Sequence, residues 1–191
     1  MRILAISGSL RKGSHNSALL RAAADLLPPG VELAVHDGLR AIPPYDDDHE
    51  PPVPAAVQLL RDEIDGADAV LIATPEYNGS IPGQLKNALD WLSRPLQESP
   101  LRNKPVAVIG ASTGMFGAVW AQGEARKVLA AIGARVLDRE LPVPSADEQF
   151  HAHGHLKDKD LERELVDLLE ALGDAVAARA RRANTPEGAL R

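Results

Sequence analysis

The sequence predicts an α/β fold, a three-layer sandwich around a parallel sheet of five strands in the order 2-1-3-4-5. Strand-like apolar stretches alternate with stretches of helical periodicity along the chain. The stretches 69–73 and 106–109 are apolar throughout, as expected for strands that crossover helices cover on both faces. The expected strands are 2–6, 31–35, 69–73, 106–109 and 135–137, and the expected helices are 17–27, 54–65, 83–93, 117–132 and 158–182.

Residues 1–183 are expected to form a single domain, followed by a disordered tail over 184–191. Segment 36–54 is rich in proline around an acidic run, which indicates a long surface loop rather than a domain boundary. The last helix, 158–182, begins with acidic and ends with basic residues, in keeping with the helix dipole. Trp91 and Trp120 lie on expected helices and are interpreted as core or interface anchors.

Composition and charge exclude several classes of function. The chain has 191 residues, 45% of them hydrophobic, so one core of ordinary size is expected. It lacks cysteine, which excludes disulfides and thiolate chemistry, so any redox reaction needs a bound cofactor. The formal charge of −6 argues against nucleic-acid binding, and the absence of a long apolar stretch argues against a membrane span. We therefore expect a cytoplasmic protein with small-molecule partners.

Three loops are expected to meet at one edge of the sheet. In doubly wound sheets, ligands bind beyond the carboxyl ends of the strands, where the strand order reverses. Loops 7–16, 74–82 and 110–117 follow the first, third and fourth strands, and each has unusual composition.

The first loop is suited to a phosphate monoester. It joins a strand to a helix start, where free N–H groups and the helix dipole favour an anion. Ser9, Ser14 and Asn16 add short polar side chains, and Arg11 and Lys12 add positive charge. No dinucleotide-type or P-loop glycine pattern can be written here. The alternative is that Ser14 or Asn16 simply caps the helix.

The second loop is suited to the edge of a planar ring. Pro75 and Pro82 stiffen it, and Gly79 permits a positive φ that brings main chain close to a ligand. Pro82 is expected in the first turn of the next helix. Main-chain N–H groups at 76–78 would donate to the ring edge, and Tyr77 offers a flat face to a ring or a subunit contact.

The third loop contains three glycines that let main chain approach a ring. It also contains a G-x-S-x-G pattern centred on Ser112, which is the setting of a hydrolase nucleophile. A serine hydrolase is therefore an alternative hypothesis, although it leaves the other two loops without a function. Its acid and base would come from Asp138, Asp147, His151, His153 and His155.

Two polar clusters are not interpreted as metal sites. The alternate histidines of 151–155 lack neighbouring cysteine, and the acidic run 46–50 lacks the spacing of a calcium loop. Both are expected to be solvated.

Segments 8–16 (GSLRKGSHN) and 75–91 (PEYNGSIPGQLKNALDW) resemble the NADPH-dependent FMN reductase family of flavodoxin-like proteins, which includes quinone, chromate and azo-dye reductases. The resemblance covers most of the chain. It implies that the first loop contacts the FMN phosphate and that 75–78 lie along the isoalloxazine. The implied cofactor contacts are Ser9, Arg11, Ser14, His15, Asn16, Pro75, Glu76, Tyr77, Asn78, Ser112 and Gly114.

The resemblance also implies a homodimer or homotetramer with the flavin site near a subunit interface. On this hypothesis, NADPH or NADH passes hydride to flavin N5 in a ping-pong cycle, and a quinone, flavin, azo compound or metal oxyanion then accepts it. No side chain need act as acid or base, and main-chain groups of 110–117 would stabilise the reduced flavin. The alternative is an electron-transfer flavodoxin without a nicotinamide site, although Arg11 is atypical of flavodoxin phosphate loops.

Overall fold

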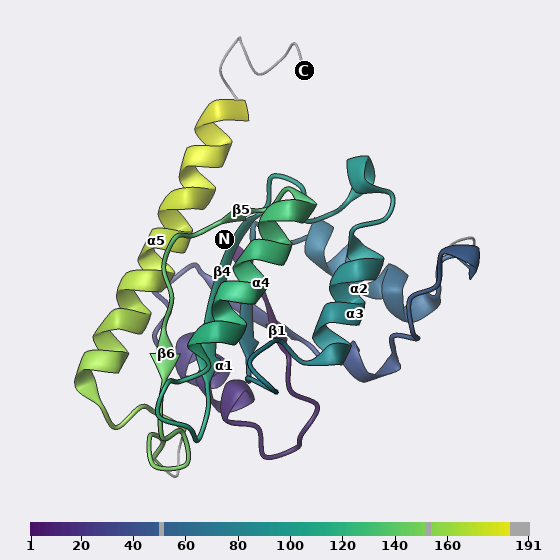
Figure 1. Ribbon diagram of the computed structural model, residues 1–191. Coiled ribbons are helices and arrows are strands. Elements are labelled where there is room, and N and C mark those ends of the chain that lie inside the picture. The colour runs from purple at the N-terminus through teal and green to yellow at the C-terminus, as the bar shows by residue number, and fades with distance from the viewer. Residues whose placement is uncertain (50–51, 152–153, 184–191) are drawn as a thin grey trace.

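A computed structural model describes residues 1–49, 52–151 and 154–183. A parallel sheet lies at its centre, with helices on both faces (Figure 1). The strands are β1 Arg2–Ser7, β2 Glu32–His36, β3 Ala69–Thr74, β4 Pro105–Ala111, β5 Arg135–Val136 and β6 Pro142–Val143. The helices are α1 His15–Asp25, α2 Ala55–Asp65, α3 Gly83–Leu92, α4 Val119–Ile132 and α5 Lys159–Ala183, with 3-10 turns η1 Leu39–Ala41, η2 Asp47–His49 and η3 Leu96–Glu98.

The predicted strand order is confirmed, because the sheet runs β2-β1-β3-β4-β5 with every pairing parallel. The predicted fifth strand at 135–137 is confirmed as β5, and a sixth short strand, β6, was not predicted. Two short strands share that edge, β5 beside the beginning of β4 and β6 beside its end. Pro142 has no N–H to donate, and the Leu141 N–H bonds to Gln122 Oε1 at 3.0 Å instead of to β4. The edge is therefore interrupted.

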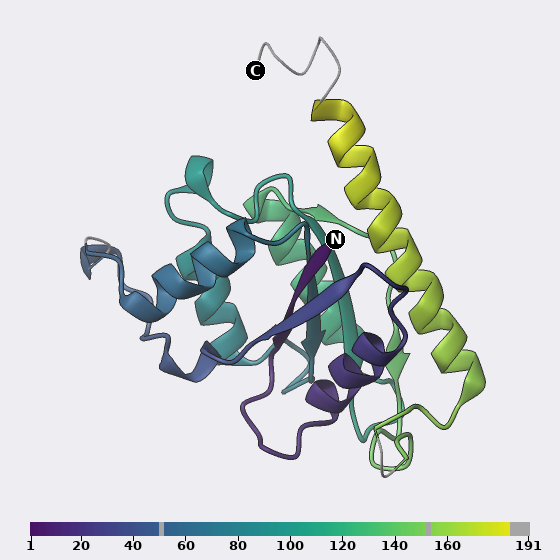
Figure 2. The same cartoon turned by 180° about the vertical axis from the view of Figure 1, so that it is seen from behind.

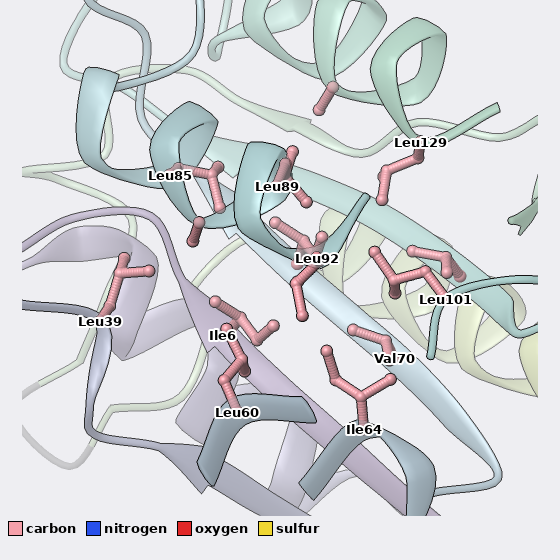
Figure 3. Packing of buried hydrophobic residues seen from close by; sticks show 14 of the residues in the cluster. Ile6, Leu39, Leu60, Ile64, Val70, Leu85, Leu89, Leu92, Leu101 and Leu129 are labelled. Carbon is pink, nitrogen blue, oxygen red and sulfur yellow. The ribbon is translucent and has the colours of Figure 1, made fainter. Parts of the chain in front are cut away.

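The two faces of the sheet bury separate apolar clusters. Alternate residues of β1 point to opposite faces, so Leu4 and Ile6 pack with α2, α3 and α4, whereas Ile3 and Ala5 pack with α1 and α5. Figures 1 and 2 show α4 and α1 on opposite sides of the sheet. Figure 3 shows leucine and isoleucine side chains of the first cluster packed together between the strands and the helices that cover this face of the sheet. Both central strands, β3 and β4, are buried along their whole length.

Residues 39–45, which belong to the predicted surface loop 36–54, are attached to the core. Leu39 and Ile42 are buried in the first cluster. The Trp91 Nε1–H donates to the Pro43 carbonyl oxygen at 2.9 Å, and Asn87 bonds to the same carbonyl and to the Tyr45 N–H. Trp91 is thus a core anchor, as predicted. The predicted tail, 184–191, lies outside the described residues.

One buried cation, Lys104, bonds to carbonyl groups at the C-terminal end of α2. Lys104 is buried, and its Nζ donates to the Ala67 carbonyl at 2.6 Å and the Asp65 carbonyl at 3.4 Å. Burial lowers the pKa of Lys104, and Arg179 acts in the same direction, while Asp65 and Asp68 oppose them. The last carbonyls of a helix have no N–H partner within the helix, and Lys104 supplies donors to the carbonyls at and just beyond the end of α2. Within the described ranges, no helix combines the length and apolarity that crossing a membrane requires.

We expect Gly117→Ala to lower the free energy of unfolding by about 2 kcal/mol or more. Gly117 has φ +57°, and a Cβ there would lie 2.6 Å from the Pro142 carbonyl carbon. Gly123, inside α4, is the matched control, since an added Cβ meets nothing within 4 Å and Ala should stabilise the helix by about 0.5–1 kcal/mol. Urea unfolding measures both, and equal stability of the two variants would contradict the backbone argument.

Candidate functional site

The three predicted loops meet in one pocket of about 370 Å³ at the carboxyl ends of β1, β3 and β4. Most predicted site residues line it, and only Asn78 and Gly114 lie outside its wall. Ala111 and Thr113 also line the pocket, although the sequence did not single them out. The lining residues are Ser9, Arg11, Ser14, His15, Asn16, Pro75, Glu76, Tyr77, Ala111, Ser112 and Thr113.

The loop after β1 is folded by its own hydroxyl and main-chain groups (purple in Figure 1). The Arg11 N–H donates to Ser9 Oγ at 3.4 Å, and the Ser14 N–H donates to the Arg11 carbonyl at 3.1 Å. Serine residues and tight turns together keep the loop compact without a glycine at a positive φ in the 8–13 region. The Arg11 side chain is exposed at the rim.

The N-terminus of α1 opens into this pocket. Ser14 is the N-cap, and its Oγ accepts from the Ser17 N–H at 3.3 Å, so the alternative function of helix capping applies to Ser14. Among the described residues, no group accepts from the N–H of His15 or Asn16. These two donors and the helix dipole remain for an anion. His15 stacks on Phe150 with ring centroids 6.3 Å apart, which fixes its ring at the rim.

Asn16 ties the two walls of the pocket together. Its Nδ2 donates to the Ala111 carbonyl at 2.9 Å, and the Ala111 N–H donates to its Oδ1 at 3.0 Å. Only 2% of Asn16 is exposed, so both bonds are shielded from water. Because its amide is engaged in this way, the group that Asn16 offers a phosphate is its main-chain N–H.

The loop after β3 contains a two-residue turn. Asn78 and Gly79 have φ of 53° and 74°, the pattern of a type I′ turn, and the N–H groups of Tyr77 and Ser80 each donate to the other's carbonyl. The predicted positive φ at Gly79 is confirmed. The expectation that Tyr77 N–H donates to a ligand is wrong, since the turn uses it. Pro82 is the N-cap of α3, so it stands just before the first helical turn in which it was predicted to lie.

Glu76 has a second function that the sequence analysis missed. Its Oε2 accepts from the N–H groups of Trp120 and Ala121 at 3.1 and 3.2 Å. The N-cap position of α4 is Ala118, which has no side-chain acceptor, so the carboxylate of Glu76 caps α4 from another loop. The absence of a capping residue near 118 is the signal in the sequence that a carboxylate must come from elsewhere.

Main-chain groups of 110–117 were expected to stabilise the reduced flavin, but most of their N–H groups already bond within the protein. Those of Gly110, Ala111, Ser112, Gly114 and Gly117 bond within the protein. Among the described residues, no acceptor takes the N–H of Thr113 or of Glu76 across the pocket. One N–H group without an acceptor therefore remains in the loop after β3, at Glu76, and one in the loop after β4, at Thr113.

The arrangement around Ser112 does not favour a hydrolase. Its Oγ accepts from the Gly114 N–H at 3.1 Å, and among the described residues the pocket contains none of the proposed acids or the histidines of 151–155. Asp138 lies beside Arg126, and His155 lies beside Asp25, each at 3.9 Å. His153 is outside the described residues. Over 1–49, 52–151 and 154–183, no three acidic or histidine side chains are placed to hold a metal.

Large apolar side chains surround the outer wall. Tyr77, Met115, Phe116 and Trp120 are each more than half exposed, and the rings of Phe116 and Trp120 meet edge to face at 4.9 Å. Glu76, next to Tyr77 in the chain, bonds to the main chain of Trp120, so we refer to these four exposed side chains together as the apolar rim. Trp120 is therefore a surface residue in the single chain, unlike Trp91.

Replacing Asn16 by Ala should lower the free energy of unfolding by about 2–4 kcal/mol, because both polar groups of the buried Ala111 lose their partner. Thermal or urea denaturation measures the loss. Gln58→Ala, which removes an exposed amide of α2, is the control and should change stability by less than about 0.5 kcal/mol. A similar small effect at Asn16 would show that the clamp does not stabilise the fold.

Comparison with known proteins agrees with this geometry. Residues 1–148 match the family model of NADPH-dependent FMN reductase. The chain is 46% identical over 168 residues to the NAD(P)H-dependent FMN reductase PA1204 of Pseudomonas aeruginosa, covering 87% of this chain and 89% of that protein. It is 40% identical over 141 residues to a quinone reductase of Escherichia coli, covering 73% and 74%.

Solved structures show the same architecture. The flavoenzyme NAD(P)H:(acceptor) oxidoreductase FerB of Paracoccus denitrificans superposes with a TM-score of 0.82 at 33% identity, covering 93% of this chain and 98% of FerB. A flavodoxin of Pseudomonas aeruginosa has a TM-score of 0.54 at 18% identity, covering 94% and 99%, which shows likeness of fold. The fold is flavodoxin-like, as predicted, and the chain belongs to the NADPH-dependent FMN reductase family.

Proposed function

We propose that this chain is an FMN-containing oxidoreductase that takes electrons from NADPH or NADH and passes them to a small acceptor such as a quinone, a flavin, an azo compound or a metal oxyanion. The observation that carries the proposal is the single pocket into which loops 7–16, 74–82 and 110–117 converge. Family membership supports the class of reaction, and the pocket supplies the chemistry that FMN binding requires.

The residues at one end of the pocket fit a phosphate. Ser9 and Ser14 bring hydroxyls, Arg11 brings a guanidinium, and the N–H groups of His15 and Asn16 point from the positive end of α1. Charged and main-chain donors together can meet several oxygens of a phosphate dianion, and charge-assisted bonds of this kind are among the strong ones in proteins.

The residues at the other end fit a planar ring. Pro75 and the turn at Tyr77 hold the loop after β3 rigid, while Asn16 holds Ala111 in place. The remaining main-chain donors, at Glu76 and Thr113, can bond to heteroatoms on a ring edge without any rearrangement. Fixed donors of this kind stabilise negative charge that develops on a ring, because they cost no reorganisation at the moment of reaction.

FMN, when bound, supplies the ability to accept a hydride and to return its electrons to a second substrate. The protein's part is to hold the ring and to leave one face open to both substrates in turn, which predicts ping-pong kinetics. No residue of the pocket need move a proton at a defined atom for this reaction. Tyr77, half exposed beside the pocket, is placed to bound the face through which a substrate enters.

We also propose that the protein assembles as a homodimer or homotetramer. The exposed apolar rim of Tyr77, Met115, Phe116 and Trp120 supports a second copy of the chain covering the outer wall. The proposal places the protein in the cytoplasm, where the reduced nicotinamides that it would use are produced.

Anaerobic absorbance spectroscopy tests the reaction. The purified protein with FMN should show a bound-flavin spectrum that bleaches when NADPH or NADH is added, and a quinone added afterwards should restore it. Bound flavin that neither nucleotide reduces would indicate an electron-transfer flavodoxin instead. A protein that binds no flavin would remove both hypotheses, and an esterase assay of Ser112 would then follow.

Arg11→Ala should raise the Kd for FMN by roughly ten- to a hundredfold, because a charged donor to a phosphate contributes about 1.5–3 kcal/mol. Quenching of flavin fluorescence measures the affinity, and far-ultraviolet circular dichroism checks that the fold is intact. The matched control is Lys127→Ala, which removes an exposed cation of α4 outside the pocket and should leave the affinity unchanged. Unaltered FMN affinity in Arg11→Ala would remove this residue from the site.

A further inference from the structure

A second pocket lies on the other side of the loop after β1. Its volume is about 510 Å³, and it is bounded by the ends of β1 and β2, by one face of α1 and by the segment 37–40. It shares only Ser9 and Arg11 with the pocket assigned to FMN. Its lining residues are Ser7, Ser9, Leu10, Arg11, Lys12, Ser17, Arg21, Val35, His36, Asp37, Leu39 and Arg40.

This second pocket is strongly basic in an acidic protein. Its cations are Arg11, Lys12, Arg21 and Arg40, against one carboxylate at Asp37. Over the described parts of the chain, none of these cations forms an ion pair with a carboxylate. The whole chain carries a formal charge of −6, so this concentration of unpaired positive charge departs from its surroundings. Such a pocket attracts a multiply charged anion.

Two polar side chains of the second pocket, Ser17 and Arg40, are held in place by hydrogen bonds. The Ser17 hydroxyl donates to Ser7 Oγ at 3.0 Å, and Arg21 follows Ser17 by one helical turn on the same face of α1. Arg40 Nη2 donates to the Leu10 carbonyl at 2.7 Å, which connects the two rims of the pocket. This arrangement lowers the entropy cost of ordering the pocket around a ligand.

The floor of the second pocket is also fixed. His36, at the end of β2, is buried, and its Nδ1 lies 2.6 Å from Glu63 Oε2 on α2. This contact attaches the end of β2 to the helix behind it, so the residues that follow, including Asp37 and Arg40, start from a fixed point. The floor of the second pocket is therefore formed by the end of a strand that is fixed to α2.

One wall of the second pocket is apolar. Leu10 and Leu39 line it, and Val35 is 55% exposed although it lies within β2. An apolar surface beside hydroxyls and cations suits a ligand in which a phosphate is attached to an organic body, and it offers nothing to a bare oxyanion.

We propose that this second pocket binds the adenosine 2′-phosphate of NADPH and so makes NADPH the preferred electron donor over NADH. The inference rests on the proposed function, because it assumes that a reduced nicotinamide is the donor. NADPH carries a dianionic phosphate monoester that NADH lacks, and the unpaired cations provide its recognition. Arg11 lies between the two pockets, so a single loop serves the cofactor on one side and the donor on the other.

Calorimetric titration of the FMN-loaded protein tests the site without turnover. Adenosine 2′,5′-bisphosphate should bind at least about tenfold more tightly than 5′-AMP, which lacks the 2′-phosphate. The double variant K12Q/R21Q should weaken binding of the bisphosphate, and raise the KM for NADPH, by about tenfold, with the KM for NADH and the Kd for FMN unchanged. K127Q, which removes a distant exposed cation of α4, is the control and should change none of them.

Equal affinity for the bisphosphate and 5′-AMP, or unchanged binding in the double variant, would overturn the proposal. Inorganic phosphate that binds as tightly as the bisphosphate would also overturn it, because the pocket would then recognise a bare oxyanion. These outcomes differ from failure of the proposed function. If neither nucleotide bleaches bound flavin, the reductase hypothesis fails, whereas equal bleaching rates with NADPH and NADH would contradict only the assignment of this pocket.

Discussion

The paired hydrogen bonds between the Asn16 amide and the Ala111 main chain are the constraint on which the site depends. β1 and β4 are not neighbours in the sheet, so no strand pairing fixes the loops that follow them relative to each other. The buried amide replaces that pairing and holds the N-terminus of α1 at a set distance from the end of β4. The ends of the pocket that we propose for the phosphate and for the ring are thereby joined, and a ligand would meet donors that are already positioned.

Two other side chains, those of Gln122 and Glu76, also bond to main-chain groups that are distant in the sequence. Gln122, fully buried, donates to the Gly117 carbonyl and accepts from the Leu141 N–H, which joins α4 to the loop after β4 and to the interrupted edge of the sheet. Glu76 caps α4 from the loop after β3. Hydrogen bonds from side chains to distant main-chain groups thus fix these loops, as strand pairing fixes the strands of the sheet. Removal of Asn16 or Gln122 would leave buried main-chain groups unpaired, which makes the loops rigid for a reason separate from ligand binding.

Sequence predicted the parts of this structure that depend on local pattern. Continuous apolar stretches identified β3 and β4, and the strand order and convergence of three loops followed from the α/β alternation. Gly79 was predicted to permit a positive φ, and it adopts one, although the positive φ of Asn78 beside it was not predicted. The sixth strand, the partners of Asn16 and Glu76, and the basic pocket beside β2 were missed. Each depends on residues tens of positions apart, which periodicity does not relate.

If both proposals hold, one short loop serves two ligands, and the division of charge explains how it can. A protein of net charge −6 repels anions at long range, so both phosphates require local clusters of cations that outweigh the field of the whole. Arg11 belongs to both pockets, and a phosphate bound on one side neutralises part of its charge. Lys12, Arg21 and Arg40 border only the second pocket and keep its potential positive when the first is filled. The arginine alone would make the two proposed ligands compete electrostatically, and the surrounding cations would allow both to bind together.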